Sequence, residues 1–252
     1  MEEHTTTPSV RPMTFAEKLT NIFASPGELF ENVRLTQRTT SNWLIPWAIF
    51  VLVAILMGQL MIQNASLADQ LGATIRKGFD QQVQEGKMSQ DQADQVYETF
   101  AKPGSTWFTL AQIGGVTFGS LAALFILALV YWFVGKTAMN ATAPYLKVVE
   151  VVGLTFFIAT LEQIVTTLMM FAVDSLYASP SLAIFVSEFN VENKLHVAMA
   201  KINIFTFWDL SVVSIGLSKL FQRDLPKVLV LVFALWVLWS LITIFTGFRL
   251  GG

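Results

Sequence analysis

The chain has 252 residues, of which 54% are hydrophobic and 13% are charged, and its mean hydropathy is +0.56. Soluble domains carry about 25% charged residues, so this composition excludes an ordinary soluble domain and indicates a membrane protein. The net charge of −2 argues against a nucleic-acid partner, and the absence of cysteine excludes disulfides, thiol catalysis and thiolate metal sites.

Residues 1–42 are predicted to form a polar tail with an amphipathic helix on the cytoplasmic face. Apolar side chains recur there at helical spacing, at Phe15, Leu19, Ile22 and Phe23. Two alternatives remain open for this tail. The helix lies on the membrane surface, or it is a cap that packs on the spans without a separate lipid role.

A further helix start is predicted at Ser25, Pro26, Gly27 and Glu28. Ser25 is expected to cap the helix, and Pro26 suits the first helical position, where a missing N–H costs little. Glu28 completes the pattern of a capping box ahead of Phe30. These residues are therefore a candidate N-terminal cap motif.

Five hydrophobic stretches are long enough to cross a bilayer as helices. A hydrocarbon core of about 30 Å takes about 20 apolar residues in helical form. The stretches are residues 43–61, 107–134, 148–173, 202–220 and 228–245. They predict an all-α fold, with a polytopic bundle of about five transmembrane helices over residues 43–246 and a short C-terminal tail at 247–252.

The loop at residues 63–105 is too long for a simple connector. Leu67, Leu71, Ile75, Phe79 and Val83 recur every four residues, and the apolar spacing continues after a break. The break falls at Gly86 and Ser89. The pattern predicts an extramembrane helical hairpin between spans one and two, with a hydrated, mildly acidic outer face.

The lysines and arginines beside the spans predict the orientation, because cytoplasmic loops are enriched in them. A cytoplasmic N-terminus places the following residues inside: Arg34, Arg38, Lys136, Lys147, Lys219, Arg223 and Lys227. Near the spans of the opposite face lie Lys194, Lys201 and Arg249. We therefore expect an inner-membrane protein with its N-terminus in the cytoplasm and its C-terminus outside.

Two carboxylates within the spans form a candidate intramembrane polar site. Glu162 lies near the middle of span three, and Thr155 and Thr166 are predicted to share its face. Asp209 lies at the centre of span four. Such residues face the bundle interior, because a charge in lipid costs several kcal/mol. They indicate either a proton or cation site or a structural hydrogen bond that orders the bundle.

Small residues mark candidate helix contacts. Gly115 and Gly119 form a small-xxx-small pattern, which lets two helices approach closely within the chain or between copies. Gly216 lies on the side of span four that carries Asp209 and is a third candidate.

Signatures of catalysis are missing from the sequence. It contains no Gly-x-Ser-x-Gly elbow, no His-Glu-x-x-His, no phosphate loop and no dinucleotide fingerprint. We therefore expect no enzymatic activity, no catalytic residues, no cofactor and no metal.

Three segments of the sequence form a recognisable set: Phe-Ala-Ser-Pro-Gly-Glu-Leu-Phe at 23–30, the short connection at 135–147, and Ile-Phe-Thr-Phe-Trp-Asp-Leu at 204–210 running to Ser218. They resemble the Yip (Ypt-interacting protein) domain family, most closely its bacterial branch. The resemblance covers residues 21–246 and implies a five-span protein with a cytoplasmic N-terminus. Eukaryotic relatives act in vesicle traffic through small GTPases, but their acidic-Leu-Trp-Gly-Pro signature is missing here, which argues against a GTPase partner.

The resemblance implies that some bacterial members are accessory subunits of ATP-driven export systems. The leading hypothesis is a non-catalytic integral membrane protein that binds other membrane proteins or copies of itself. It would be an accessory to export, trafficking or envelope systems. The alternative is a small ion- or proton-coupled transporter or channel that uses its intramembrane carboxylates. The other expected partner is the lipid bilayer itself.

Overall fold

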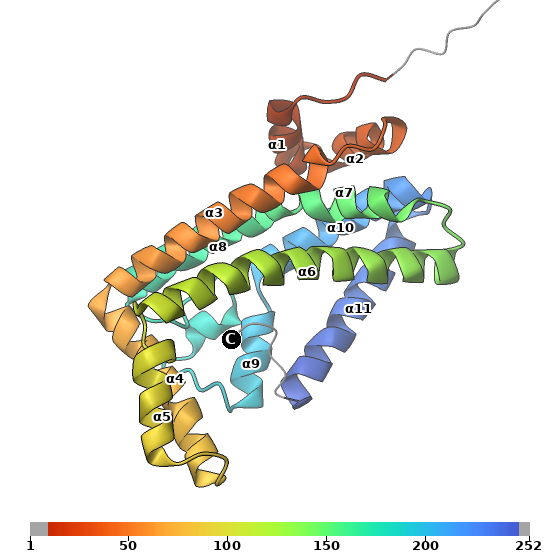
Figure 1. Ribbon diagram of the computed structural model, residues 1–252. Coiled ribbons are helices and arrows are strands. Elements are labelled where there is room, and N and C mark those ends of the chain that lie inside the picture. Colours follow the sequence, from red (N-terminus) through yellow and green to blue (C-terminus); the bar gives the residue numbers. More distant parts are fainter. Residues whose placement is uncertain (1–9, 247–252) are drawn as a thin grey trace, which may run out of the picture. The chain divides into compact units, whose positions relative to one another are not determined.

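A computed structural model describes residues 10–246, and these residues fold as helices (Figure 1). Within that range the β structure is limited to an isolated bridge between Ser181 and Asn203. The predicted C-terminal tail, 247–252, lies outside the described residues. The helices long and apolar enough to cross a membrane number five: α3 (Ser41–Gln63), α6 (Thr106–Met139), α7 (Tyr145–Leu154) continued by α8 (Phe156–Val173), α10 (Ile204–Phe221) and α11 (Leu225–Thr246). The predicted all-α membrane fold is confirmed.

The chain divides into two compact units. Unit 1 comprises residues 1–47, 124–157 and 209–235, and unit 2 comprises residues 48–123, 158–208 and 236–252. Every span contributes residues to both units. Unit 1 also holds the N-terminal helices, and unit 2 holds the hairpin and the connection between α8 and α10.

The N-terminal helices of unit 1 differ in how they pack. In α2 (Pro26–Leu35), Leu29, Phe30 and Val33 are fully buried. In α1 (Phe15–Ala24) the apolar face is divided, because Ile22 is buried while Phe15, Leu19 and Phe23 are exposed. The alternative of a packed cap therefore describes α2, and α1 keeps an exposed apolar face.

The predicted cap at Ser25 is not formed by its side chain, although α2 does begin at Pro26. Ser25 is also the C-cap of α1, and its N–H donates to the Asn21 carbonyl at 3.0 Å. Its ψ of 61° departs from the extended geometry of an N-cap. The Ser25 carbonyl accepts from the Glu28 N–H at 3.0 Å instead, and the expected capping box with Glu28 is absent.

A capping box forms at the start of α1. The Glu17 N–H donates to the Thr14 hydroxyl at 3.3 Å, and the Thr14 N–H donates to the Glu17 carboxylate at 2.6 Å. Arg11 adds an ion pair to the same carboxylate at 2.6 Å. The Thr14 backbone bond, followed by the Arg11 bond, lowers the pKa of Glu17 from an ordinary 4.5 to about 2.

Acid is therefore expected to fray the first turn of α1. A carboxyl whose pKa is lowered by folding stabilises the fold fully above its unfolded pKa, and that contribution is lost as the pH falls from 4.5 towards 2. Since the chain has no cysteine, a spin label at a Thr20→Cys substitution reports on α1 alone. Its mobility should rise over this pH interval. With Glu17→Ala added, which removes the capping side chain, mobility should be high and independent of pH, and a persistent acid transition would contradict the assignment.

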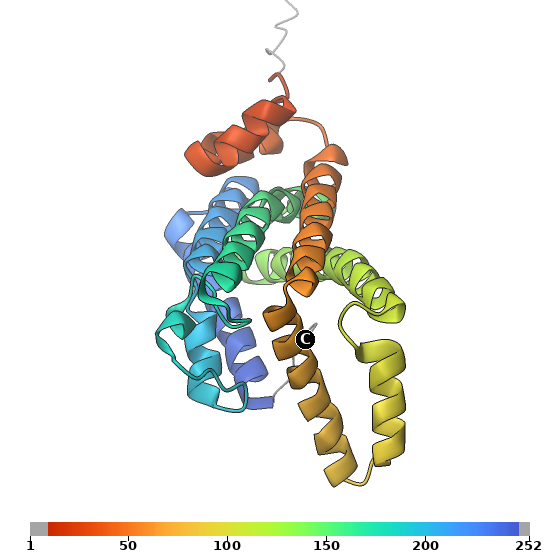
Figure 2. The same cartoon turned by 90° about the vertical axis from the view of Figure 1, so that its left-hand side faces the viewer.

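The hairpin predicted between spans one and two is confirmed in unit 2. Figure 2 shows α4 (Ala65–Gln84) beside α5 (Gln90–Val96) and the π-helical turn η1 (Tyr97–Ala101). Gly86 makes the turn at a φ of +70°, which glycine adopts without strain, and Ser89 caps α5. Arg76 lies 3.9 Å from the Tyr97 ring centroid, so the two arms pack through side chains as well.

The connection between α8 and α10 docks on α4. It contains the 3-10 turn η2 (Leu182–Phe185) and α9 (Lys194–Lys201). The Gln70 side chain donates to the Asp174 carbonyl at 2.9 Å and accepts from the Leu176 N–H at 3.1 Å. The hairpin and this connection therefore pack together in unit 2.

Candidate functional site

A buried ion pair lies at the start of the third span, in unit 1. Glu150 and Lys147 are three residues apart on α7, with 2% and 6% of their surfaces exposed. The Lys147 ammonium donates to Glu150 Oε2 at 3.2 Å and to the Val33 carbonyl at 2.6 Å. Because that carbonyl belongs to α2, the lysine joins α2 to the third span.

Glu150 accepts two further bonds from the segment that leads into α3. The Thr39 N–H donates to Oε1 at 3.0 Å, and the Asn42 amide donates to Oε2 at 2.8 Å. Lys18 of α1 then donates to Asn42 Oδ1 at 2.6 Å. We call Lys18, Asn42, Lys147 and Glu150 the buried network. It connects α1, α2 and α3 to α7.

The buried network places more positive than negative charge inside unit 1. Partial burial lowers the pKa of Lys18, since the charged ammonium loses water; Glu150 opposes this change, and Lys147 adds to it. Both Glu150 oxygens already accept hydrogen bonds. The single carboxylate therefore has little capacity left to compensate another cation.

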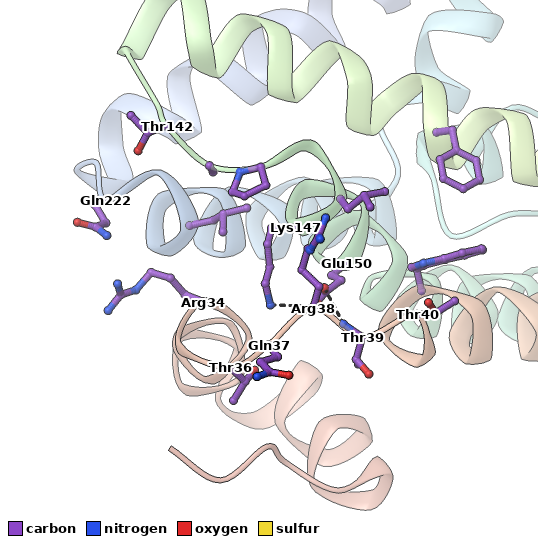
Figure 3. Close-up of a pocket in the computed structure, with 16 residues that line it drawn as sticks. Arg34, Thr36, Gln37, Arg38, Thr39, Thr40, Thr142, Lys147, Glu150 and Gln222 are labelled. Atoms are coloured by element: carbon purple, nitrogen blue, oxygen red, sulfur yellow. Dashed lines mark hydrogen bonds and ion pairs between the residues drawn. The ribbon is translucent and has the colours of Figure 1, made fainter. Parts of the chain in front are cut away.

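An open pocket of about 980 Å³ adjoins the buried network (Figure 3). Its lining comes from the end of α2 to the start of α3, from Phe125 within α6, from the connection between α6 and α7 with the first turns of α7, and from the end of α10: Arg34, Thr36, Gln37, Arg38, Thr39, Thr40, Trp43, Phe125, Thr142, Ala143, Pro144, Leu146, Lys147, Glu150, Leu220 and Gln222. All of these residues belong to unit 1. The pocket is polar and basic on one side and apolar at Trp43, Phe125 and Leu146.

Glu162, the first carboxylate singled out in the sequence, lies in unit 2. It is partly buried, and its Oε1 accepts from the Asn203 amide at 2.7 Å. Asn203 in turn accepts from the Phe205 N–H at 2.8 Å in the first turn of α10, and it forms the bridge with Ser181. This chain of contacts favours the structural alternative, in which Glu162 holds the start of α10.

The companions predicted for Glu162 have different surroundings. Thr155 is buried at the break between α7 and α8, and its hydroxyl donates to the Val152 carbonyl at 3.0 Å. The rotation of 100° per residue therefore applies to Thr166, on α8 with Glu162, but not across the break to Thr155. Asp209 belongs to unit 1 and interacts electrostatically with the buried Tyr131. The assignment of Glu162 and Asp209 to a candidate intramembrane polar site stays a prediction.

Glu162→Gln should leave the free energy of unfolding close to that of the wild type, because the glutamine carbonyl can still accept the hydrogen bond from the Asn203 amide. Glu162→Ala should lower the free energy of unfolding by about 1–3 kcal/mol, the cost of a buried donor left without an acceptor. Unfolding in detergent measures both effects. Ion or proton flux into liposomes provides the second readout, since a flux that the wild type shows and Glu162→Gln loses would favour the transport alternative.

The glycines predicted to mediate helix contacts divide into two kinds. Gly115 and Gly119 are exposed on α6, and a Cβ added at either would meet no described heavy atom within 4 Å. Gly216 is tightly packed, since its added Cβ would lie 2.5 Å from Val151 Cγ1 and 3.1 Å from the Phe30 ring. Contacts between copies at Gly115 and Gly119 stay a prediction.

Reasoning from the sequence missed the pairing of Lys147 with Glu150 and the close packing of Gly153, whose added Cβ would lie 2.2 Å from the Trp43 Cβ. The sequence prediction considered only carboxylates near the middle of a span. Glu150 lies in the second turn of α7, a position typical of the membrane interface. The available signal was the spacing Lys-x-x-Glu, which places opposite charges on one helix face within an otherwise apolar run. Gly153 has no glycine partner three or four residues away, so no small-residue motif marks it.

Comparison with known proteins agrees with this architecture. The Yip1 domain family matches residues 20–247. Membrane protein YknW of Bacillus subtilis (strain 168) is 26% identical over 221 residues, which cover 87% of this chain and 83% of the relative. No solved structure matches the chain. With nearly its whole length matched and its five spans in place, this chain belongs to the Yip1 domain family of integral membrane proteins.

Proposed function

We propose that the chain is a non-catalytic membrane protein that acts by binding other membrane proteins, as an accessory to an export, trafficking or envelope system. The observation that carries the proposal is the attachment of α1 and α2 through the buried network. Lys147 holds the Val33 carbonyl of α2, and Lys18 of α1 holds Asn42. Breaking a buried ion pair costs about 3–5 kcal/mol, so the Lys147–Glu150 pair holds α2 firmly on the third span. The bond from Lys18 to Asn42 and the buried Ile22 orient α1 beside it.

The exposed face of α1 supports a binding role. Phe15, Leu19 and Phe23 remain 46%, 37% and 37% exposed, although α1 is anchored through Ile22 and Lys18. Phe15 also contacts the Phe157 ring, with centroids 5.9 Å apart. Exposed apolar patches on an ordered element are typical of protein or membrane interaction sites.

A photoreactive amino acid at Leu19 tests the proposal in native membranes. We expect a reproducible crosslink to an integral membrane protein that is lost when Phe15 and Phe23 are replaced by glutamate. The matched control is the same probe at Phe118 of α6, which is 73% exposed and should capture lipid. The proposal would be refuted if the probes at both positions gave only lipid adducts and if no crosslinked partner were enriched over an unrelated five-span protein.

We further propose that the protein lies in a bacterial cytoplasmic membrane with its N-terminus inside. All the basic residues that the orientation rule assigned to the cytoplasm fall in unit 1, whereas Lys194 and Lys201 fall in unit 2. A single cysteine at Gln82, in the hairpin, should react with a membrane-impermeant maleimide in intact cells. A cysteine at Thr20 should react only after lysis, and the reverse pattern would invert the topology.

A further inference from the structure

The pocket of unit 1 contains one cation without a counter-charge. Its lining includes the cations Arg34, Arg38 and Lys147 and a single carboxylate, Glu150. Lys147 is paired with Glu150, and Arg34 is paired with Glu31 of its own helix. Arg38 is exposed and makes no hydrogen bond or ion pair with any residue between 10 and 246. Figure 3 shows Arg38 on the segment between α2 and α3, among the residues that line the pocket.

The rest of the polar lining supplies hydrogen-bond donors. Thr39, Thr40 and Thr142 also line this pocket, and their hydroxyls make no hydrogen bond to another described side chain or backbone group. Glu150 makes no ion pair with Arg38, and its oxygens accept from Thr39, Asn42 and Lys147 instead. Free donors, a free guanidinium and no free carboxylate make this a pocket for an anion.

We propose that this pocket binds a phosphate group through Arg38, and that the phosphate belongs to an anionic phospholipid. The planar guanidinium matches two phosphate oxygens at once. The pocket also lies beside the amino end of α3, where the helix dipole favours negative charge.

The position of the pocket selects lipid over soluble phosphate. Its lining segments are the start of α3, the connection between α6 and α7, and the end of α10. Because successive spans reverse direction, these ends share one membrane face, at the level of the headgroups. Trp43 and Phe125 pack edge to face at 5.3 Å and form an apolar wall with the exposed Leu146. Basic pockets of this kind between span ends bind anionic headgroups, while acyl chains follow the apolar side.

Native mass spectrometry of the full chain in detergent tests the site. The probes are phosphatidylglycerol, zwitterionic phosphatidylcholine, and glycerol 3-phosphate as a soluble phosphate. We expect saturable retention of phosphatidylglycerol in preference to phosphatidylcholine. Arg38→Gln should weaken the binding of phosphatidylglycerol about tenfold or more, because the charge-assisted hydrogen bonds to the phosphate are lost. Arg38→Lys should recover part of the affinity, because it restores the charge but not the two-point geometry.

Lys227→Gln is the matched control. Lys227 is an exposed cation of unit 1, paired with Asp224 and absent from the pocket lining, so its removal should leave lipid retention unchanged. Equal melting temperatures for the variants would show that Arg38 acts on binding and not on folding. Glycerol 3-phosphate that binds as tightly as the lipid and depends on Arg38 would overturn the lipid assignment. Phosphatidylglycerol retained equally by wild type and Arg38→Gln would overturn the site.

Discussion

Replacing Glu150 by alanine is expected to lower the free energy of unfolding by about 3–5 kcal/mol, the cost of leaving a buried charge unpaired. The Lys147 ammonium would keep only the Val33 carbonyl, and the donors on Thr39 and Asn42 would lose their acceptor. Detergent-induced unfolding of the purified protein measures the effect. Trypsin cleavage at Arg34 should also accelerate, because α2 would be released from the third span.

Two further variants separate the ion pair from a general charge effect. Glu28→Ala removes an exposed carboxylate of α2 and should change stability by about 0.5 kcal/mol or less. The double variant Lys147→Met with Glu150→Leu should cost clearly less than the sum of its single changes, because no buried charge remains. Additive losses, or equal losses for Glu150→Ala and Glu28→Ala, would show that the buried network is not a cooperative unit.

Gly153→Ala should destabilise the protein by about 1–3 kcal/mol, in the range found for overpacked cores. The added Cβ would lie 2.5 Å from the Trp43 Cα, and this neighbour is backbone, which cannot rotate away. The third span and α3 would have to separate within unit 1. Thermal unfolding in detergent gives the size of the effect, and the bulkier Gly153→Leu should cost more.

Gly115→Ala is the matched control for Gly153→Ala. No described heavy atom lies within 4 Å of its added Cβ, so the change should be neutral or stabilise helix α6 by up to about 1 kcal/mol. A loss at Gly115 as large as that at Gly153 would show that the small-xxx-small pattern packs against another molecule. It would therefore be informative to measure the oligomeric state of the same variant.

The segments that begin at Thr14 and Ser25 show when a local sequence pattern predicts a helix cap correctly. Both segments match the pattern Ser/Thr-x-x-Glu, and both are compatible with a helix start. Thr14 follows an extended segment and is free to adopt the geometry of an N-cap, with φ −66° and ψ 166°. Ser25 lies directly between the last residue of α1 and the first residue of α2, so both helices constrain its backbone conformation. The pattern predicts a cap only where the preceding chain leaves the residue free.

Local, additive properties were determined by the sequence alone. The spans, the hairpin with its turn at Gly86 and the start of α2 at Pro26 follow from hydrophobicity summed over a window, side-chain periodicity and backbone preference. These quantities do not depend on distant neighbours. They were sufficient to identify an all-α membrane protein, whereas the resemblance to the Yip family rested on the residues of three particular segments.

The candidate site was decided only by the tertiary structure. Asn42 and Glu150 are separated by 108 residues, and Val33 and Lys147 by 114. Whether Lys147 is an interfacial charge or a buried one depends on α2 reaching it, and whether Gly153 matters depends on where the backbone of Trp43 runs. Burial and close packing are properties of pairs of segments, and no single stretch of sequence specifies its partner.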